Sequence, residues 1–345
     1  MKRITTTVST PVAHLVGPGK IKIINTRLAY TPVEGETMRL DLNALRTLLC
    51  YGDISFTDEA LHQLLSHEVE VACLTPHGNR CRGRLVTAET RSAGLRLLQY
   101  GAAINPSARL ALARLIVVDK LDSQLVVARR IQRRGGDLAP LATTLLQQLR
   151  TAAQDAARSV SFDGLRGLEG NAARAWFQLV SLLIEPPFNF TIRIRRPPTD
   201  PVNALLSLGY TLIFSRILAR IQSAGLEPTL GMLHDLRPGR PSLACDLIES
   251  LRAPLVDCWV IDLCNNKKVM PDYFEAKPDG ACHLIRERFP HILASWEEHW
   301  QRSQGREQLE LVLTQFIKRL RTLAPTEPLQ TELPGPFPRD PGDED

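Results

Sequence analysis

The sequence contains no uninterrupted apolar run near the ~18 residues that a membrane-spanning helix needs. Its start, Met1-Lys2-Arg3-Ile4 followed by three threonines, lacks the apolar block of a secretory signal peptide. We therefore expect a cytoplasmic protein with no membrane partner. The composition, 44% hydrophobic and 23% charged, is typical of a globular protein, and the length of 345 residues suggests two domains or one large one.

Several common site types are also missing. The 7 cysteines form no Cys-x-x-Cys pair, so a zinc ribbon or a disulfide framework is not expected, and buried reduced thiols are the preferred interpretation. The sequence has no Gly-x-x-x-x-Gly-Lys-Ser/Thr loop and no Gly-x-Ser-x-Gly elbow. The neighbours Cys282 and His283 are interpreted as a surface coincidence, because catalytic Cys/His pairs are rarely adjacent in sequence.

Lysine is scarce while arginine is abundant, with 8 lysines among the 42 basic residues. The formal net charge is +5, but residues 323–345 carry −5, so residues 1–322 carry +10. A basic, arginine-rich body favours a polyanionic partner, because arginine binds phosphate through a planar fork. An arginine bias in the codons of a GC-rich genome would give the same composition, and that alternative stays open.

The patterning changes along the chain and predicts an α+β fold. Short apolar-polar alternations and turn signals make the first ~85 residues β-rich, whereas helical periodicity dominates afterwards. We predict a small N-terminal β-sandwich domain over 1–88, a larger all-α domain over 89–323, and an acidic, proline-rich, disordered tail over 324–345. Helices are expected over 106–133, 138–160, 169–184, 202–224, 242–263 and 306–323.

Three sites in the helical part carry candidate chemistry. Glu169 lies between two glycines where a helix is expected to open, and His234 ends a short apolar run. Asp246 and Glu249 are three apart on an expected helix, so both carboxylates should lie on one face. Each has a plain structural alternative: an acid that offsets a helix dipole, a satisfied histidine, and solvated or arginine-paired carboxylates.

Taken together, these side chains would suit an oxygen-preferring divalent ion. Carboxylates with one imidazole match Mg²⁺ or Mn²⁺ better than structural zinc. Such an ion beside a phosphodiester would polarise it and activate an attacking hydroxyl. Periodicity alone does not establish that the three sites meet in space.

The residues at this point resemble a known family. GLEGNAARAWF (167–177) resembles the Gly-x-Glu-Gly-x-Ala-Ala-Arg-x-Tyr-Phe element of the CRISPR-associated adaptation integrases. RRPPTDPVNALLSLGYTL (195–212), GLEPTLGMLH (225–234) and GRPSLACDLIESLRAPLVD (239–257) resemble the elements that follow, in the same order. The segment 48–85 is similar to the end of the family's β-domain. Trp176 stands where the family has tyrosine, and neither the first ~20 residues nor the acidic tail has a clear counterpart.

The resemblance implies a β-sandwich followed by a helical domain, and a homodimer formed through the β-domain. It also implies a small ferredoxin-like adaptation partner, and the insertion of short double-stranded DNA fragments (spacers) into a CRISPR array by attack of a 3′-hydroxyl on the repeat. The family's metal ligands correspond to Glu169, His234 and Glu249, which would be the catalytic residues here, with Asp246 as a supporting acid. A structure-specific nuclease without integration and a non-catalytic DNA-binding scaffold remain alternatives.

Proximity to these motifs suggests phosphate contacts, with solvated surface charge as the equally weighted alternative. The candidate DNA-binding residues are Arg240 and Arg252 beside the metal site, and Arg193, Arg195, Arg196, Lys267 and Lys268 further out.

Overall fold

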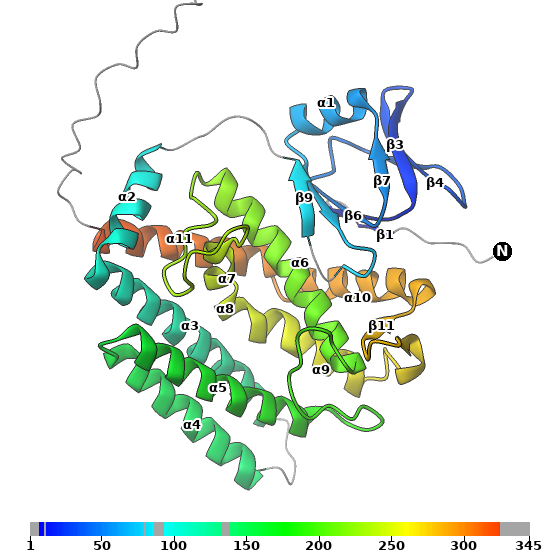
Figure 1. Ribbon diagram of the computed structural model, residues 1–345. Coiled ribbons are helices and arrows are strands. Elements are labelled where there is room, and N and C mark those ends of the chain that lie inside the picture. The colour runs from blue at the N-terminus through cyan, green and yellow to red at the C-terminus, as the bar shows by residue number, and fades with distance from the viewer. Residues whose placement is uncertain (1–6, 10–11, 79–80, 86–92, 133–138, 325–345) are drawn as a thin grey trace, which may run out of the picture.

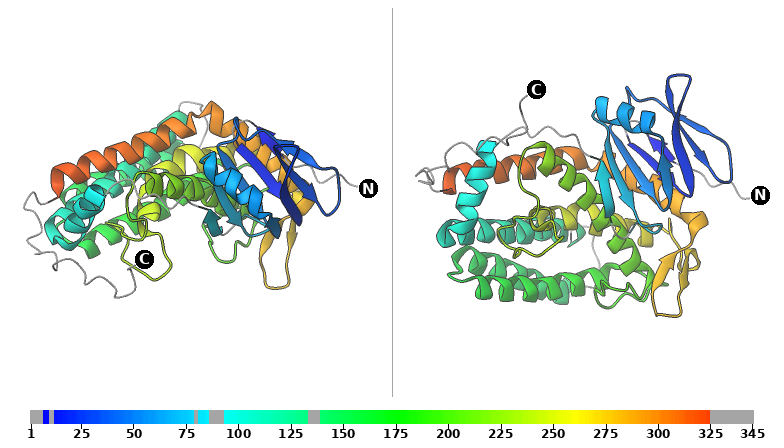
Figure 2. Two further views of the ribbon diagram at one scale, coloured as in Figure 1. Left: turned by 90° about the horizontal axis from the view of Figure 1, so that it is seen from above. Right: turned by 45° about the horizontal axis from the view of Figure 1, so that its top comes forward.

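The computed structural model describes residues 7–9, 12–78, 81–85, 93–132 and 139–324. The predicted acidic tail (apart from Ala324) and the predicted domain boundary near residue 88 lie outside these residues. A β-rich N-terminal part sits at one end of a larger helical part, as Figure 1 shows and the two views of Figure 2 confirm. The predicted α+β fold class and its order along the chain are therefore correct.

The N-terminal part consists of two sheets and one helix. The first sheet has the order β1-β2-β6-β8-β9 and the second the order β5-β4-β3-β7. β2, β6 and β8 run parallel to one another, while the hairpin β3–β4 is antiparallel. The elements are β1 (Thr7–Ser9), β2 (Val12–Val16), β3 (Gly19–Ile24), β4 (Arg27–Pro32), β5 (Met38–Leu40), β6 (Thr47–Tyr51), β7 (Ile54–Phe56), α1 (Asp58–Ser66), β8 (Glu70–Leu74) and β9 (Cys81–Leu85).

The central strands of the first sheet, β2, β6 and β8, are largely buried on both faces. Alternate residues of a strand point to opposite faces, so Leu48 packs in the core between the two sheets while Leu49 and Tyr51 pack against the helical part. His14 on β2 is fully buried, and its Nε2 lies 2.8 Å from Glu297 in the helical part. The two parts of the chain therefore share one continuous core cluster.

The helical part is dominated by long helices whose ends follow their capping residues. Asn105 accepts a hydrogen bond from the Ala108 N–H at the start of α3, and Asp200 caps α6 in the same way. The elements are α2 (Ala93–Ile104), α3 (Pro106–Gln132), α4 (Ala139–Arg158), α5 (Phe162–Leu183), α6 (Pro201–Ser223), α7 (Ser242–Leu247), α8 (Glu249–Leu251), α9 (Cys258–Asn265), β10 (Phe274–Ala276), β11 (Cys282–Leu284), α10 (Phe289–Arg302) and α11 (Gly305–Leu323).

Two helix predictions need correction. Glu169 lies inside α5 and not at a helix opening, because Ser161 caps the helix earlier by accepting from the Gly164 N–H. The continuous helix over 242–263 is broken into α7, α8, a π-helical segment (Arg252–Asp257) and α9. Pro254 lies in the π-helical segment, where the missing N–H and the bulk of its ring disfavour a regular α-helix. Helices α2 and α10 and the hairpin β10–β11 were not predicted from the sequence.

Within the part of the chain that the structure describes, one helix is long and apolar enough, by length and composition, to cross a membrane. It is α6, and 72% of its most apolar window is buried inside the protein, which fits a core helix. The 7 cysteines, all within the described residues, are free, as predicted, but only Cys50, Cys264 and Cys282 are buried and the other four are half-buried.

Candidate metal and nucleic-acid site

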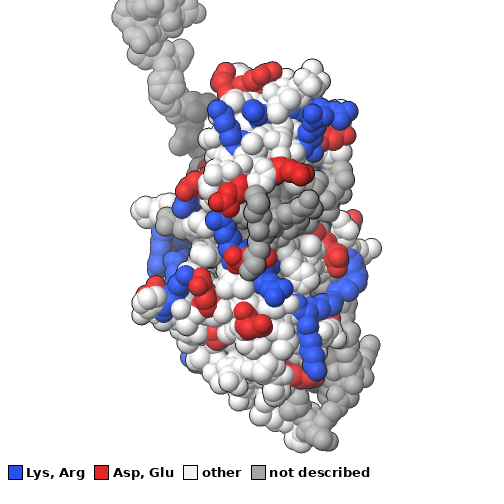
Figure 3. Space-filling model, turned by 90° about the vertical axis from the view of Figure 1, so that its right-hand side faces the viewer, with Lys and Arg blue, Asp and Glu red and all other residues white. Residues whose placement is uncertain are grey.

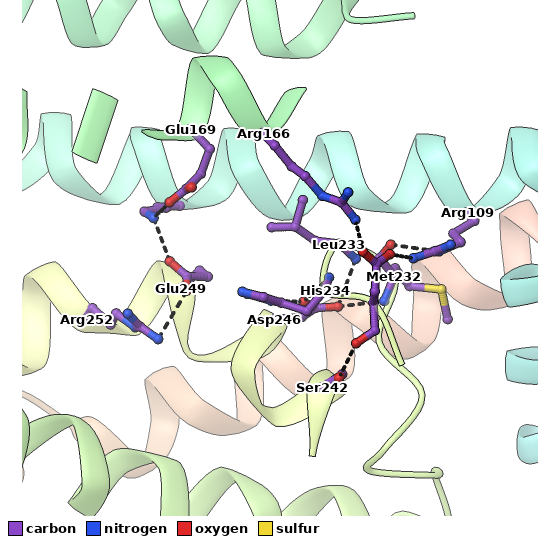
Figure 4. Close-up of polar contacts among 12 residues, drawn as sticks. Arg109, Arg166, Glu169, Met232, Leu233, His234, Ser242, Asp246, Glu249 and Arg252 are labelled. Atoms are coloured by element: carbon purple, nitrogen blue, oxygen red, sulfur yellow. Dashed lines mark hydrogen bonds and ion pairs between the residues drawn. The ribbon is translucent and has the colours of Figure 1, made fainter. Parts of the chain in front are cut away.

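The site is built around a lysine that sequence analysis did not single out. The ammonium of Lys120 on α3 donates a hydrogen bond to Glu169 Oε1 on α5, and it lies 2.7 Å from Glu249 Oε2 on α8. Figure 4 shows the side chains of Glu169 and Glu249 pointing toward each other from two separate helices. The Lys120 and Glu249 side chains are 7% and 5% exposed, and that of Glu169 is 28% exposed. Two of the three predicted ligands therefore meet in space, held by a single cation.

The charges at this centre are strongly coupled. Burial alone would raise the pKa of Glu249, but Arg252 and Lys120 lower that pKa to about 2. Burial disfavours charge on Lys120, yet the carboxylates of Glu249 and Glu169 prevail and raise its pKa above the ordinary value. The centre is thus a buried cluster of ionised groups at neutral pH.

Arg252 holds Glu249 from the other side. Its Nη2 lies 3.2 Å from Glu249 Oε1, and its guanidinium lies 4.9 Å from the centroid of the Tyr210 ring. The stacked aromatic ring fixes the plane of the guanidinium. Arg252 therefore acts on the site through Glu249.

Asp246 organises the loop that carries His234. Its Oδ2 accepts hydrogen bonds from the N–H groups of Met232 (2.6 Å) and Leu233 (3.0 Å). Its Oδ1 accepts from the His234 N–H at 3.0 Å and lies 2.6 Å from the ring Nδ1. A Cβ on Gly231 would lie 2.9 Å from Asp246 Oδ2, so the loop can approach this closely only with glycine there. Because Nδ1 donates to the carboxylate, Nε2 carries the lone pair that a cation could use.

The prediction that Asp246 and Glu249 lie on one continuous helix is wrong. The helix is interrupted at Ile248, and the two carboxylates have different partners: the loop of His234 for Asp246, and Lys120 with Arg252 for Glu249. Asp246 takes the role expected of a supporting acid, holding a candidate ligand without contacting Glu249.

The chemical types of these side chains suit an ion that prefers oxygen ligands, but their positions do not form a complete coordination site. Among the described residues, no three His, Cys, Asp or Glu side chains form a group that could hold a metal ion. Glu249 Oε2 is buried and accepts no hydrogen bond of good geometry from any described residue, although Lys120 Nζ lies 2.7 Å from it. Two ionised carboxylates and a free imidazole nitrogen are ligands of the type that Mg²⁺ and Mn²⁺ accept.

A second charged cluster adjoins His234. Asp235 accepts hydrogen bonds from Arg109 on α3 (2.8 Å) and Arg166 on α5 (2.6 Å). The bond from Arg109 contributes most to lowering the pKa of Asp235. Both guanidiniums lie over the Phe162 ring, at 4.7 and 5.8 Å from its centroid. This cluster ties the loop to two helices and leaves arginines beside the candidate ligands.

The predicted DNA-binding residues fall into two groups. Arg193 and Arg252 are engaged internally: Arg193 donates to Asn203 Oδ1 at 2.8 Å and to Ser207 Oγ at 3.0 Å. Four others are exposed and one is half-buried. The exposed ones are Arg195, Arg196, Lys267 and Lys268, the half-buried one is Arg240, and Lys268 pairs with Asp262 at 3.1 Å. Figure 3 shows basic side chains spread over one side of the molecule and interspersed with acidic ones.

The sequence did carry a signal for Lys120. Ala113, Val117, Lys120 and Gln124 lie on one face of α3, and all four are buried. A lysine within such a stripe must find a negative partner when the helix packs.

Comparison with known proteins identifies the family. The model of the family "CRISPR associated protein Cas1" matches residues 14–298. The chain belongs to the Cas1 family. A Thermus thermophilus relative named CRISPR-associated endonuclease Cas1 3 is 33% identical over 293 residues, covering 81% of this chain and 84% of the relative.

Two solved structures share the fold. A Cas1 protein from Thermotoga maritima superposes with a TM-score of 0.78 at 21% identity, covering 90% of this chain and 96% of that one. A casposase bound to its integration product superposes with a TM-score of 0.74 at 20% identity, covering 91% and 90%. The resemblance noted in the sequence is therefore correct at the level of the family and the fold.

Proposed function

We propose that this Cas1 protein is a metal-dependent DNA endonuclease and strand transferase that inserts short DNA fragments into a CRISPR array. The observation that carries the proposal is the convergence of Glu169 and Glu249, from two separate helices, on one cation beside His234. The Thermus relative is named an endonuclease, and the casposase of similar fold is described as bound to an integration product.

Glu169, His234 and Glu249 would hold Mg²⁺ or Mn²⁺. When bound, the ion would polarise a phosphate oxygen of the repeat and lower the pKa of the attacking 3′-hydroxyl. Arg252 and Lys120 keep Glu249 ionised, since they depress its pKa to about 2. Asp246 keeps the proton on Nδ1 of His234, so that Nε2 can bind the ion.

Exposed basic residues would hold the DNA. The proposed set is Arg195, Arg196, Arg240, Lys267 and Lys268, while Arg193 and Arg252 would act from inside by shaping the site. Each direct phosphate contact should add slightly less than one unit to the salt dependence of binding. Phosphate contacts carry no base information, so sequence choice would come from DNA shape and from partner geometry.

The proposed assembly follows the family resemblance. The chain would act in the cytoplasm as a homodimer, with residues 1–88 as dimerisation domain, residues 89–323 as catalytic domain, and a small ferredoxin-like adaptation subunit as partner.

The alternatives are a structure-specific nuclease without integration, which uses the same ligands, and a DNA-binding scaffold without chemistry.

The test uses the purified chain, its cognate small partner, a labelled duplex with free 3′-hydroxyls and a supercoiled plasmid that carries the repeat. Label should join the plasmid with Mg²⁺ or Mn²⁺ but not with EDTA, and Glu169→Ala should abolish joining. Glu185→Ala, an exposed acid just after α5, is the matched control and should join normally.

Cutting without joining would favour the nuclease alternative. DNA binding without any processing, by wild type and Glu169→Ala alike, would favour the scaffold and overturn the metal-site proposal.

A further inference from the structure

Lys120 occupies the space that separates the two candidate ligand carboxylates. Its ammonium donates to Glu169 and lies 2.7 Å from Glu249 Oε2, and its side chain is 7% exposed. A cation buried at this depth is stable only because both carboxylates compensate for its lost hydration. The reverse also holds, because without a cation between them the two carboxylates would repel each other inside the protein.

We propose that Lys120 is an internal counter-cation that holds Glu169 and Glu249 together in the metal-free protein and competes with the divalent ion for them. The inference rests on the proposed function, since it assumes that these carboxylates bind the ion. Metal loading then requires the ammonium to leave the gap, and the affinity for the ion is lower than the two carboxylates alone would give.

The chemistry of the side chain suits displacement. Lysine presents a single ammonium on a flexible four-carbon stem, whereas arginine presents a rigid fork that grips carboxylates at two points. Arg252, on the other side of Glu249, is stacked on Tyr210 and fixed in place. Of Lys120 and Arg252, which both contact Glu249, Lys120 is therefore the one able to swing away, and its partner Glu169 is the more exposed of the two carboxylates.

Glu249 would keep a buried counter-charge when the ammonium leaves. Arg252 Nη2 lies 3.2 Å from Glu249 Oε1, and the Tyr210 ring holds the guanidinium in place, so only Oε2 loses its cation to the incoming ion. A lysine that serves only as packing, or only as a rigid support for ligand geometry, would not weaken metal binding.

The test measures Mn²⁺ binding to the full chain by calorimetry and by electron paramagnetic resonance, together with thermal unfolding in EDTA and in Mn²⁺. Lys120→Met and Lys120→Gln remove the charge but keep much of the stem. We expect both variants to melt below wild type in EDTA, to bind Mn²⁺ roughly tenfold more tightly than wild type, and to gain more in Tm on adding Mn²⁺. Lys318→Met, at an exposed position of α11, is the control and should match wild type in all three measurements.

The inference would be overturned if both Lys120 variants bound Mn²⁺ with unchanged or lower affinity. It would also be overturned if both variants remained unfolded with and without Mn²⁺. Folding that is restored by Mn²⁺ supports it. Glu169→Gln separates the inference from the proposed function: if Mn²⁺ binding by wild type does not depend on Glu169, then the metal site itself is misassigned.

Discussion

Asp246 holds His234 at two points, by accepting its backbone N–H at 3.0 Å and by contacting its ring Nδ1 at 2.6 Å. The aspartate is fully buried and its four contacts all go to the loop that ends at the histidine. The position and the tautomer of the candidate ligand are thus both set by one carboxylate.

Asp246→Asn should therefore damage metal binding and stability together. The amide NH₂ would face backbone N–H donors, leaving buried groups unsatisfied at a cost of roughly 2–3 kcal/mol. Loss of the carboxylate behind a metal-binding imidazole typically lowers metal affinity by about 10–100-fold. Urea unfolding and Mn²⁺ titration measure the two effects.

The matched control for Asp246 is Asp272→Asn, at an exposed position. It should leave both quantities unchanged. If Asp246→Asn kept wild-type Mn²⁺ affinity while folding normally, His234 would not bind the ion through Nε2 with its Nδ1 held by Asp246.

A second buried acid makes a prediction about pH. Asp257 accepts hydrogen bonds from the Trp176 Nε1–H and the Tyr210 hydroxyl. Burial raises the pKa of Asp257 to about 6, although both hydrogen bonds oppose the shift. Because the folded-state pKa is raised, the stability contributed by the protonated acid is fully present below about pH 4 and is lost as the pH rises through about 6.

Asp257→Asn should remove this pH dependence. Asparagine can accept from Trp176 and donate to the Tyr210 oxygen, so the variant should fold. Over pH 4.5–7, the free energy of unfolding of wild type should fall relative to that of the variant by about 2 kcal/mol. Parallel pH profiles for the two proteins, measured by urea unfolding, would show that Asp257 is ionised throughout the range.

Local signals explain which parts of the fold were predictable. The start of α3 follows from Asn105-Pro106, and the β-rich nature of the first ~85 residues follows from alternation and turns. The parallel pairing of β2 with β6 was not predictable, because it joins strands separated by a hairpin and a further strand in sequence. Helix α10 buries eight of its residues against other elements, a pattern that single-segment periodicity did not reveal.

The site divides in the same way. The motifs identified Glu169, His234, Asp246 and Glu249, but the spacing of the last two implied a continuous helix, which is interrupted at Ile248. Lys120 was missed because its meaning depends on two acids that are distant in sequence, and a single buried lysine has no motif. The hydrogen bonds that tie Arg193 to the protein interior were not predictable either, because its partners Asn203 and Ser207 lie on the following helix.

The junction between the two parts of the chain depends on a buried ion pair. Glu297 on α10 contacts His14 from the first sheet at 2.8 Å and accepts a hydrogen bond from Arg216 on α6. The Arg216 guanidinium lies 4.1 Å from the centroid of the Trp300 ring. Glu297→Gln would leave a buried arginine without its counter-charge, so we expect a loss of about 3–5 kcal/mol in the free energy of unfolding.

The neighbouring Glu298 provides the control for Glu297. It is exposed on the same helix, so Glu298→Gln should change stability by less than about 0.5 kcal/mol. Equal effects of the two substitutions in urea unfolding would mean that the buried pair does not hold the junction.

The last prediction concerns one substitution with opposite outcomes at two helical glycines. A Cβ on Gly209 of α6 would lie 2.5 Å from Val256 Cγ1, while a Cβ on Gly167 of α5 would meet nothing within 4 Å. Gly209→Ala should therefore destabilise the protein by about 1–3 kcal/mol through overpacking. Gly167→Ala should stabilise it by about 0.5–1 kcal/mol, because alanine is the better helix former. Val256→Ala should partly rescue Gly209→Ala in a double-mutant cycle and leave the effect of Gly167→Ala unchanged. If Gly209→Ala were as well tolerated as Gly167→Ala, α6 would not approach the π-helical segment as closely as described, and the support beneath Glu249 would have to be reconsidered.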